Sequence, residues 1–98
     1  MVIVTKMAYP TESVREIAKR FLEAPQIPSY LLRRGPYIST NTIDGVSVLA
    51  IYELDRSKLA DGFEYVMNST AKYFGVPGFK HEIKVYAEAR EALQSIDM

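Results

Sequence analysis

The sequence of 98 residues lacks cysteine and tryptophan, contains a single histidine and carries no net charge. The absence of cysteine excludes disulfides, thiolate metal sites and cysteine nucleophiles. Because twelve basic residues balance twelve acidic ones, no net field directs the protein to nucleic acid or to an anionic membrane. No segment approaches the ~20 apolar residues of a membrane span, and the first residues lack a signal-peptide pattern. We therefore expect a soluble, unprocessed cytoplasmic protein that binds neither partner.

The sequence also has no P-loop, serine elbow, paired-carboxylate motif or two-histidine metal spacing, so we expect neither a metal ion nor a cofactor. Hydrophobic residues make up 48% of the chain and charged residues 24%, which is typical of a globular protein. A chain of this length forms one domain, residues 1–98, with a modest core.

The segment Val46–Leu54 is predicted to be a strand that is apolar on both faces, since successive side chains of a strand point to opposite sides. Val2–Tyr9 has the same character, and both strands therefore belong in the middle of a sheet. The helices of so short a chain can cover only one face. A partner subunit is the natural cover for the second face.

Two helices and two edge strands complete the expected elements. A helix over about Glu12–Glu23 has its apolar stripe at Val14, Ile17, Ala18, Phe21 and Leu22, with Thr11 or Ser13 as its cap. A strand over Tyr30–Thr42 is interrupted by Gly35 and Pro36, which places it at an edge. Asp55 or Ser57 caps a second helix that runs to Phe74, with inner residues Leu59, Phe63, Val66, Met67, Thr70 and Phe74. Phe79–Ala87 alternates as a half-exposed strand, and a short docking helix is expected within Glu88–Met98.

The pair Asp44-Gly45 predicts a hairpin with a two-residue loop. That turn sets Tyr37 opposite Tyr52 and Asn41 opposite Val48. One face of the hairpin then carries Tyr37, Ser39, Asn41, Val48, Ala50 and Tyr52.

The element order, strand-helix-strand-strand-helix-strand, is that of a ferredoxin-like α+β fold. Right-handed crossovers then give an antiparallel sheet in the order fourth, first, third, second, with both helices on one face. Through its length, this order, the double-faced strands VIVTKMAY and VSVLAIYEL and the DG hairpin, the chain resembles the dimeric alpha+beta barrel superfamily. The resemblance implies a homodimer formed through the sheet face, with a small-molecule cleft between each sheet and its helices. Relatives of this kind act as cofactor-free monooxygenases or isomerases.

Other families with this element order need features that the chain lacks. A metal-transfer domain requires paired thiolates. An RNA-recognition module requires exposed aromatic side chains and basic residues on its central strands. An acylphosphatase-like site requires a glycine-rich loop after the first strand, where this chain has AYPTES.

Few residues are candidates for a functional site. His81 is either a general base or a solvated histidine on an edge strand. Arg33 and Arg34 either hold a carboxylate, face solvent or pair with the partner subunit. Tyr37, Tyr52 and Asn41 either bind an aromatic or phenolic ligand or cover the rim of the core or the dimer interface. Two functional classes follow, a small-molecule site that can be enzymatic and a non-catalytic binding or regulatory module.

Overall fold

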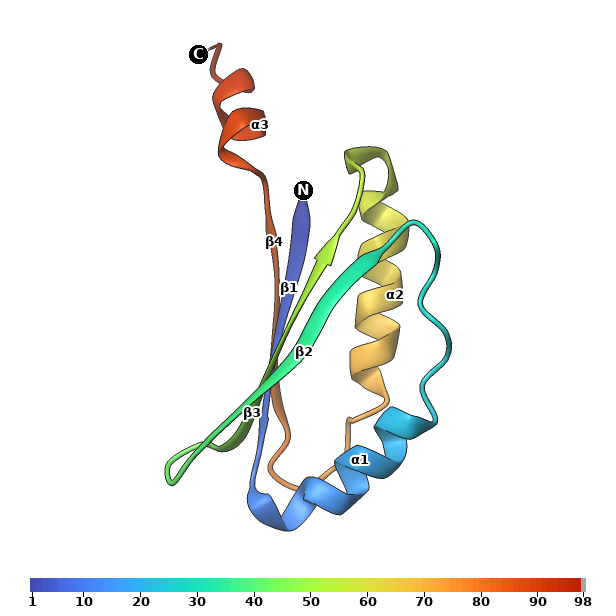
Figure 1. Ribbon diagram of the computed structural model, residues 1–98, viewed down its shortest axis with the longest axis vertical. Coiled ribbons are helices and arrows are strands. Elements are labelled where there is room, and N and C mark those ends of the chain that lie inside the picture. Colours follow the sequence, from blue (N-terminus) through green and yellow to red (C-terminus); the bar gives the residue numbers. More distant parts are fainter. Residues whose placement is uncertain (98) are drawn as a thin grey trace.

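The computed structural model describes residues 1–97 and shows an antiparallel sheet of four strands with α1 and α2 on the same side of it (Figure 1). The elements are, in order, β1 (Val2–Tyr9), a 3-10 turn (Thr11–Ser13), α1 (Val14–Leu22), β2 (Leu32–Asn41), β3 (Gly45–Glu53), a 3-10 turn (Arg56–Lys58), α2 (Leu59–Ala71), β4 (Lys80–Tyr86) and α3 (Ala89–Gln94). The expected elements are all present, with ends that differ by a few residues.

The strand order is β2-β3-β1-β4, so the two strands with apolar residues on both faces lie in the centre as expected. From the β4 edge this is the fourth, first, third and second strand, the order that the sequence predicted. The interrupted strand β2 is at one edge, and its pairing with β3 is irregular between Arg34 and Tyr37, around Gly35 and Pro36. Proline donates no hydrogen bond to a ladder, which explains why this strand is tolerated only at an edge.

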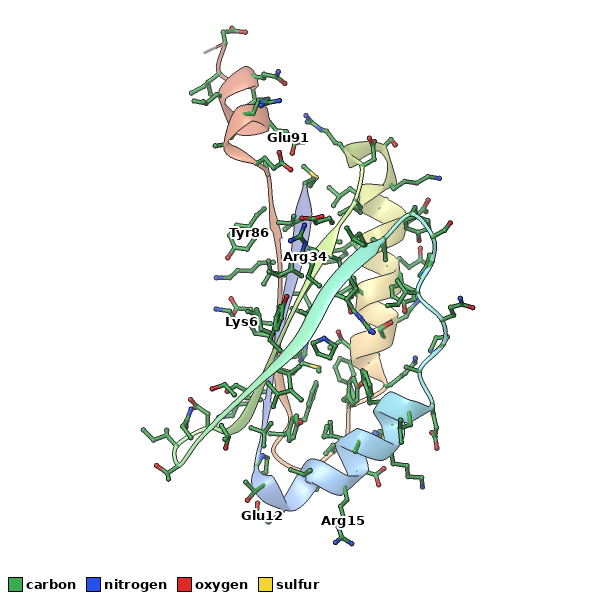
Figure 2. All side chains as sticks on the ribbon, viewed as in Figure 1. Lys6, Glu12, Arg15, Arg34, Tyr86 and Glu91 are labelled. Carbon is green, nitrogen blue, oxygen red and sulfur yellow. The ribbon has the colours of Figure 1, made fainter. Side chains whose placement is uncertain are left out.

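The two faces of the central strands differ in their cover. Most side chains of β1 and β3 that face the helices are buried, namely Ile3, Thr5, Tyr9, Val48, Ala50 and Tyr52. The opposite side, here called the open face, carries Val2, Val4, Leu49 and Ile51 at its centre, each only half-buried. Lys6 and Tyr86 also lie on the open face, pointing away from the helices (Figure 2).

At Gly62, which is buried, helix α2 packs on the side chains of the leucines that follow β3 and precede β2. A Cβ at this position would lie 2.5 Å from Leu54 Cδ1 and 3.2 Å from Leu31 Cδ2. This contact turns the stripe Gly62, Val66, Thr70 and Tyr73 toward the sheet. The expectation that Met67 and Phe74 face inward was therefore wrong, since they are 49% and 53% exposed.

Helix α1 is attached at both of its ends to the region where α2 ends. The guanidinium of Arg20 donates to the carbonyl oxygens of Lys72 (2.8 Å) and Phe74 (3.0 Å), which lie at the C-terminal end of α2. The Ser13 hydroxyl donates to the carbonyl oxygen of Pro77 (2.7 Å). Ser13 is therefore used in a long-range bond, and the capping role expected for it is not found.

The apolar stripe expected for α1 is only partly buried. Ile17 is 5% exposed, whereas Val14 and Phe21 are each 40% exposed and Leu22 is 83% exposed. Leu22 was therefore wrongly placed in the buried stripe. The partial exposure of Val14 and Phe21 shows that this helix does not pack closely along its whole length.

The hairpin between β2 and β3 differs from the prediction in loop length and register. Three residues form the loop, and Asn41 pairs with Gly45, where a two-residue loop was expected. Asn41 Oδ1 accepts the backbone N–H groups of Ile43 (2.9 Å) and Asp44 (2.6 Å), a local turn that competes with continued strand pairing. Tyr37 consequently pairs with Leu49 rather than with Tyr52, an odd shift that moves it to the open face.

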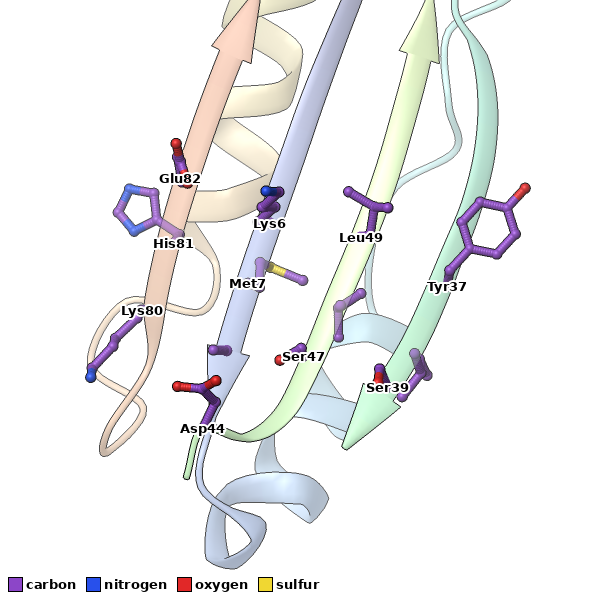
Figure 3. A pocket seen from close by; sticks show the side chains of 13 residues that line it. Lys6, Met7, Tyr37, Ser39, Asp44, Ser47, Leu49, Lys80, His81 and Glu82 are labelled. Atoms are coloured by element: carbon purple, nitrogen blue, oxygen red, sulfur yellow. The ribbon is translucent and has the colours of Figure 1, made fainter. Parts of the chain in front are cut away.

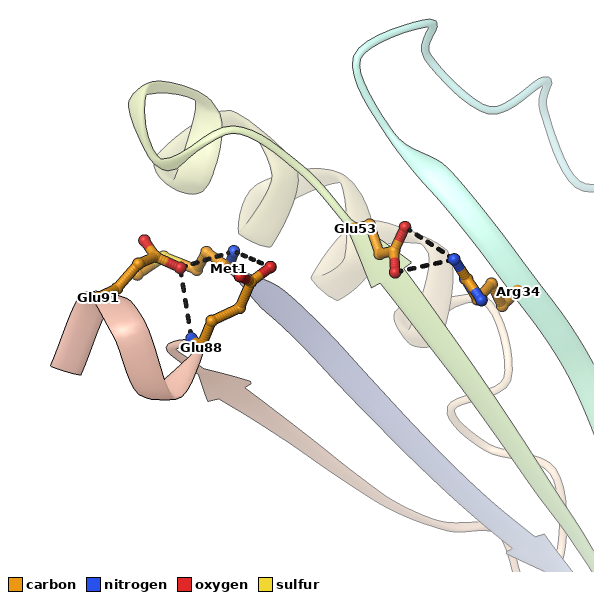
Figure 4. A network of polar contacts seen from close by, with 5 residues as sticks. All are labelled: Met1, Arg34, Glu53, Glu88 and Glu91. Carbon is orange, nitrogen blue, oxygen red and sulfur yellow. Dashed lines mark hydrogen bonds and ion pairs between the residues drawn. The ribbon is translucent and has the colours of Figure 1, made fainter. Parts of the chain in front are cut away.

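The last helix, α3, projects beyond the end of the sheet (Figure 1). The Met1 ammonium lies 2.9 Å from the Glu91 carboxylate and 3.8 Å from that of Glu88 (Figure 4). Leu93 and Ile96, the expected docking side, are 45% and 67% exposed, so α3 does not bury them against the sheet. Met98, the last residue of the expected segment, lies outside the described residues. No helix within residues 1–97 combines the length and apolar character that a membrane crossing requires.

Gly45 at the hairpin and Gly75 after α2 both have positive φ, +75° and +89°, and their surroundings predict different costs of substitution. A Cβ at Gly45 would lie 2.5 Å from the Tyr9 carbonyl oxygen, whereas a Cβ at Gly75 would meet nothing within 4 Å. Gly75→Ala should therefore cost about 1–2 kcal/mol of unfolding free energy through backbone strain alone. Gly45→Ala should cost clearly more, because the strain and the clash add. Urea denaturation of both variants measures the difference, and equal losses would contradict the contact at Tyr9.

Candidate functional site

A cleft of about 280 Å³ lies between the sheet and the two helices. Its floor comes from the helix-facing side chains of β1, β2 and β3, and its walls come from α1 and α2. Part of the lining belongs to the buried cluster around Ala50, Tyr52 and Val66, and part to the cluster around Tyr9, Ile17 and Tyr73. The cleft thus lies between two small cores and beside α1, whose Val14 and Phe21 line it.

Four of the seven tyrosines line this cleft, Tyr9, Tyr52, Tyr65 and Tyr73. Tyr9 and Tyr52 come from the central strands and Tyr65 and Tyr73 from α2 and the turn after it. Thr5, Ser69 and Thr70 add hydroxyl groups, although the Thr70 hydroxyl already donates to the Val66 carbonyl oxygen (2.9 Å). The rest of the lining is apolar apart from one arginine, so the cleft combines a large aromatic surface with a small number of polar groups.

Burial raises the pKa of the Tyr9, Tyr52 and Tyr73 hydroxyls, because the ionised form of a phenol is poorly solvated in the cleft. The positive charge of the Arg33 guanidinium offsets part of this rise in the pKa of Tyr52 and of Tyr73. One arginine therefore acts on hydroxyls from two walls of the cleft, the sheet and α2.

Arg33 is the single charged residue in the lining of the cleft. It pairs with Tyr52 in the β2–β3 ladder and so projects to the helix side of the sheet. Its neighbour Arg34 projects to the open face, where its guanidinium lies 3.2 Å from the Glu53 carboxylate (Figure 4). Within residues 1–97, Arg33 forms no ion pair. Because successive strand residues point to opposite faces, Arg34 is paired with Glu53 on the open face, whereas Arg33 points into the cleft without an acidic partner among the described residues.

The expected grouping of Tyr37, Asn41 and Tyr52 on one face was wrong. Tyr52 is 8% exposed and lines the cleft, whereas Tyr37 is 56% exposed on the open face. Asn41 lies at the hairpin and its side chain supports the turn. Of the predicted ligand-binding residues, the structure brings together Tyr52 and Arg33, and it places Tyr37 and Asn41 elsewhere.

The single histidine does not line the cleft. The His81 ring packs beside Phe74 and Phe79, with ring centroids 5.2 Å and 5.7 Å away. It is exposed on the edge strand β4 and also borders a shallow hollow of about 600 Å³ on the open face, together with Tyr37, Lys6 and Glu82 (Figure 3). His81 is therefore not placed to exchange a proton with a molecule held beside Tyr52. In the part of the chain described, no group of three or more histidine and carboxylate side chains is arranged to hold a metal ion.

Sequence analysis did not identify Tyr9, Tyr65, Tyr73 and Ser69 as lining residues. Tyr65, Ser69 and Tyr73 are spaced four residues apart, so they share one side of the helix beside its apolar stripe. This spacing is the feature of the sequence that could have identified them. Only Gly62, a small residue inside the helix, indicated that the helix would be rotated toward this stripe. Tyr9 follows from the alternation of β1, which places it on the same side as Ile3 and Met7.

No protein-family model matches the chain, and no curated protein matches it in sequence. Among solved structures, a de novo designed protein, Foldit4, is similar over 88% of this chain and 96% of its own, with 18% sequence identity and a TM-score of 0.46. This likeness is too weak to support an argument about fold or function.

The buried tyrosines predict how stability depends on alkaline pH. Because their pKa values in the folded protein lie above the ordinary value of about 10, the unfolded chain ionises first. Their contribution is complete below pH ~10 and is lost as the pH rises through the folded-state values. Tyr52→Phe should therefore lessen the alkaline loss of unfolding free energy, and Tyr37→Phe, at an exposed position, should leave it unchanged. Urea denaturation at a series of pH values measures both, and identical pH profiles would contradict the burial of Tyr52.

Proposed function

We propose that the chain is a ferredoxin-like subunit that binds a small aromatic or carboxylate molecule in the cleft between its sheet and helices. The observation that carries this proposal is the composition of the cleft, an aromatic and apolar lining with a few converging polar groups. Small-molecule sites generally have this character, because apolar walls supply binding energy and few polar groups fix orientation. A volume of about 280 Å³ suits a ligand built around one ring.

The lining of the cleft supports a binding function better than a catalytic one. Its lining has no histidine or carboxylate, the side chains that most often act as general bases, and burial raises the pKa of the Tyr9, Tyr52 and Tyr73 hydroxyls still further from neutral pH. His81, the residue best suited to proton transfer, lies outside the lining. The alternative is a cofactor-free monooxygenase- or isomerase-like enzyme, as the resemblance to dimeric alpha+beta barrels implies. Turnover of a bound ligand would favour this alternative.

A thermal-shift screen tests the binding site with phenols, quinones and small carboxylates. At least one class should raise the melting temperature of the parent protein. Ser69→Phe should remove the shift, because this half-buried residue of α2 lines the cleft and a ring would fill the space. Asn68→Phe is the matched control, since its neighbouring side chain is exposed and outside the lining. Absence of any shift in the parent, or a shift that survives Ser69→Phe, would contradict the proposed site.

We further propose that two copies pair through the open face. The half-buried Val2, Val4, Leu49 and Ile51 form an apolar centre on the side that neither α1 nor α2 covers. Tyr37 and Tyr86 flank it and are 56% and 47% exposed. Apolar surface of this kind favours association, because burial gains roughly 25 cal/mol per Å².

Sedimentation equilibrium tests the pairing. The parent should be a homodimer at micromolar concentration, and Leu49→Lys should convert it to a monomer by placing a charge at the centre of the open face. Ile43→Lys makes the same change at the hairpin tip, where Ile43 is 91% exposed, and should leave the dimer intact. A monomeric parent, or equal effects of the two substitutions, would contradict pairing through this face.

A further inference from the structure

We infer that the ligand is a small ring-bearing carboxylate whose anionic group lies at Arg33, between Tyr52 and Tyr73, with its ring toward the α1 side of the cleft. This inference rests on the proposed function and names the class of molecule that the site accepts.

The cleft carries a positive charge that no lining residue balances. Arg33 supplies one positive charge, and no aspartate or glutamate belongs to the lining. Charged groups in partly buried sites are normally paired, because desolvation is costly without a counter-charge. Arg34 shows this pairing with Glu53 one residue away, whereas Arg33 has no acidic partner within residues 1–97. An anionic ligand would supply the missing partner.

The lining of the cleft adds hydroxyl donors to that charge. Arg33 pairs with Tyr52 in the β2–β3 ladder, and Tyr73 lines the same cleft from the turn after α2. The positive charge of Arg33 also offsets part of the rise in the pKa of both hydroxyls. A guanidinium presents a planar pair of donors that matches the two oxygens of a carboxylate, and such charge-assisted bonds are about twice as strong as neutral ones. Phenol hydroxyls also donate to carboxylate oxygens, so this lining suits a carboxylate better than a neutral carbonyl.

The polar and apolar groups lie at different parts of the cleft. The polar groups belong to its buried part, where Tyr52 and Tyr73 are 8% and 6% exposed. The α1 wall and Ile38 of β2 are apolar and more open, since Val14 and Phe21 are each 40% exposed and Ile38 is 68% exposed. A ligand with an anionic head and a hydrophobic ring fits in one orientation, with the head at Arg33 and the ring against Val14 and Phe21.

Isothermal titration calorimetry with benzoate and its neutral isostere benzamide tests this inference. The parent should bind benzoate at least ~10-fold more tightly than benzamide, as expected for a charge-assisted contact. Arg33→Gln should reduce this ratio to about 1, while Arg34→Gln, the matched control on the open face, should keep the parent ratio. Because the comparison of two ligands is also made on the parent, it does not depend on the folding of a variant.

The possible outcomes separate the inference from the proposed function. If both ligands bind the parent equally, or if the preference for benzoate survives Arg33→Gln, the assignment of the anionic group is wrong although the cleft still binds small molecules. If phenols or quinones raise the melting temperature and benzoate does not bind, the ligand class is wrong in the same way. If neither these ligands nor the screened classes bind the parent, the inference and the proposed function both fail.

Discussion

The packing of α2 on the central strands is the constraint on which the rest of the structure depends. At Gly62 this helix lies in contact with Leu54 and Leu31, and a Cβ there would require the Leu54 methyl group to move. The contact fixes the rotation of the helix, buries Val66 and directs Tyr65, Ser69 and Tyr73 along the sheet. The side chains that line the cleft are therefore a consequence of one close approach at the opposite end of the helix.

The cleft itself results from the way in which α1 is attached. Arg20 and Ser13 connect this helix to the C-terminal end of α2 and to the following turn, so it is held beside the far end of the sheet. Ile17 reaches the core, but Val14 and Phe21 remain partly exposed. The space that α1 leaves open is bounded by aromatic side chains and by Arg33. A polar tether thus keeps open a space that closer apolar packing would have filled.

The hydrophobic pattern of the strands was sufficient to predict the order of the sheet. The residues that line the cleft could not be predicted in the same way, because they depend on the pairing register of β2 with β3. Double-faced hydrophobicity placed β1 and β3 in the centre, and Gly35 with Pro36 placed β2 at an edge. The hairpin register could not be obtained from Asp44-Gly45 alone, because the Asn41 side chain starts the turn earlier and lengthens the loop. The odd register shift at the turn separates Tyr37 from Tyr52, and the second irregularity, between Arg34 and Tyr37, places Arg33 opposite Tyr52. The turn and this irregularity together decide which residues share the cleft.

The most direct test of this account is to locate a bound ligand on the protein by nuclear magnetic resonance. Benzoate titrated into labelled protein should shift the backbone amide signals of cleft residues such as Arg33, Ala50 and Ser69. The amides of Ser39, Ser47 and Glu82 border the hollow on the open face and should shift little. Shifts concentrated on the open-face residues, with none at Arg33 and Ala50, would contradict the central claim that the cleft between sheet and helices is the binding site.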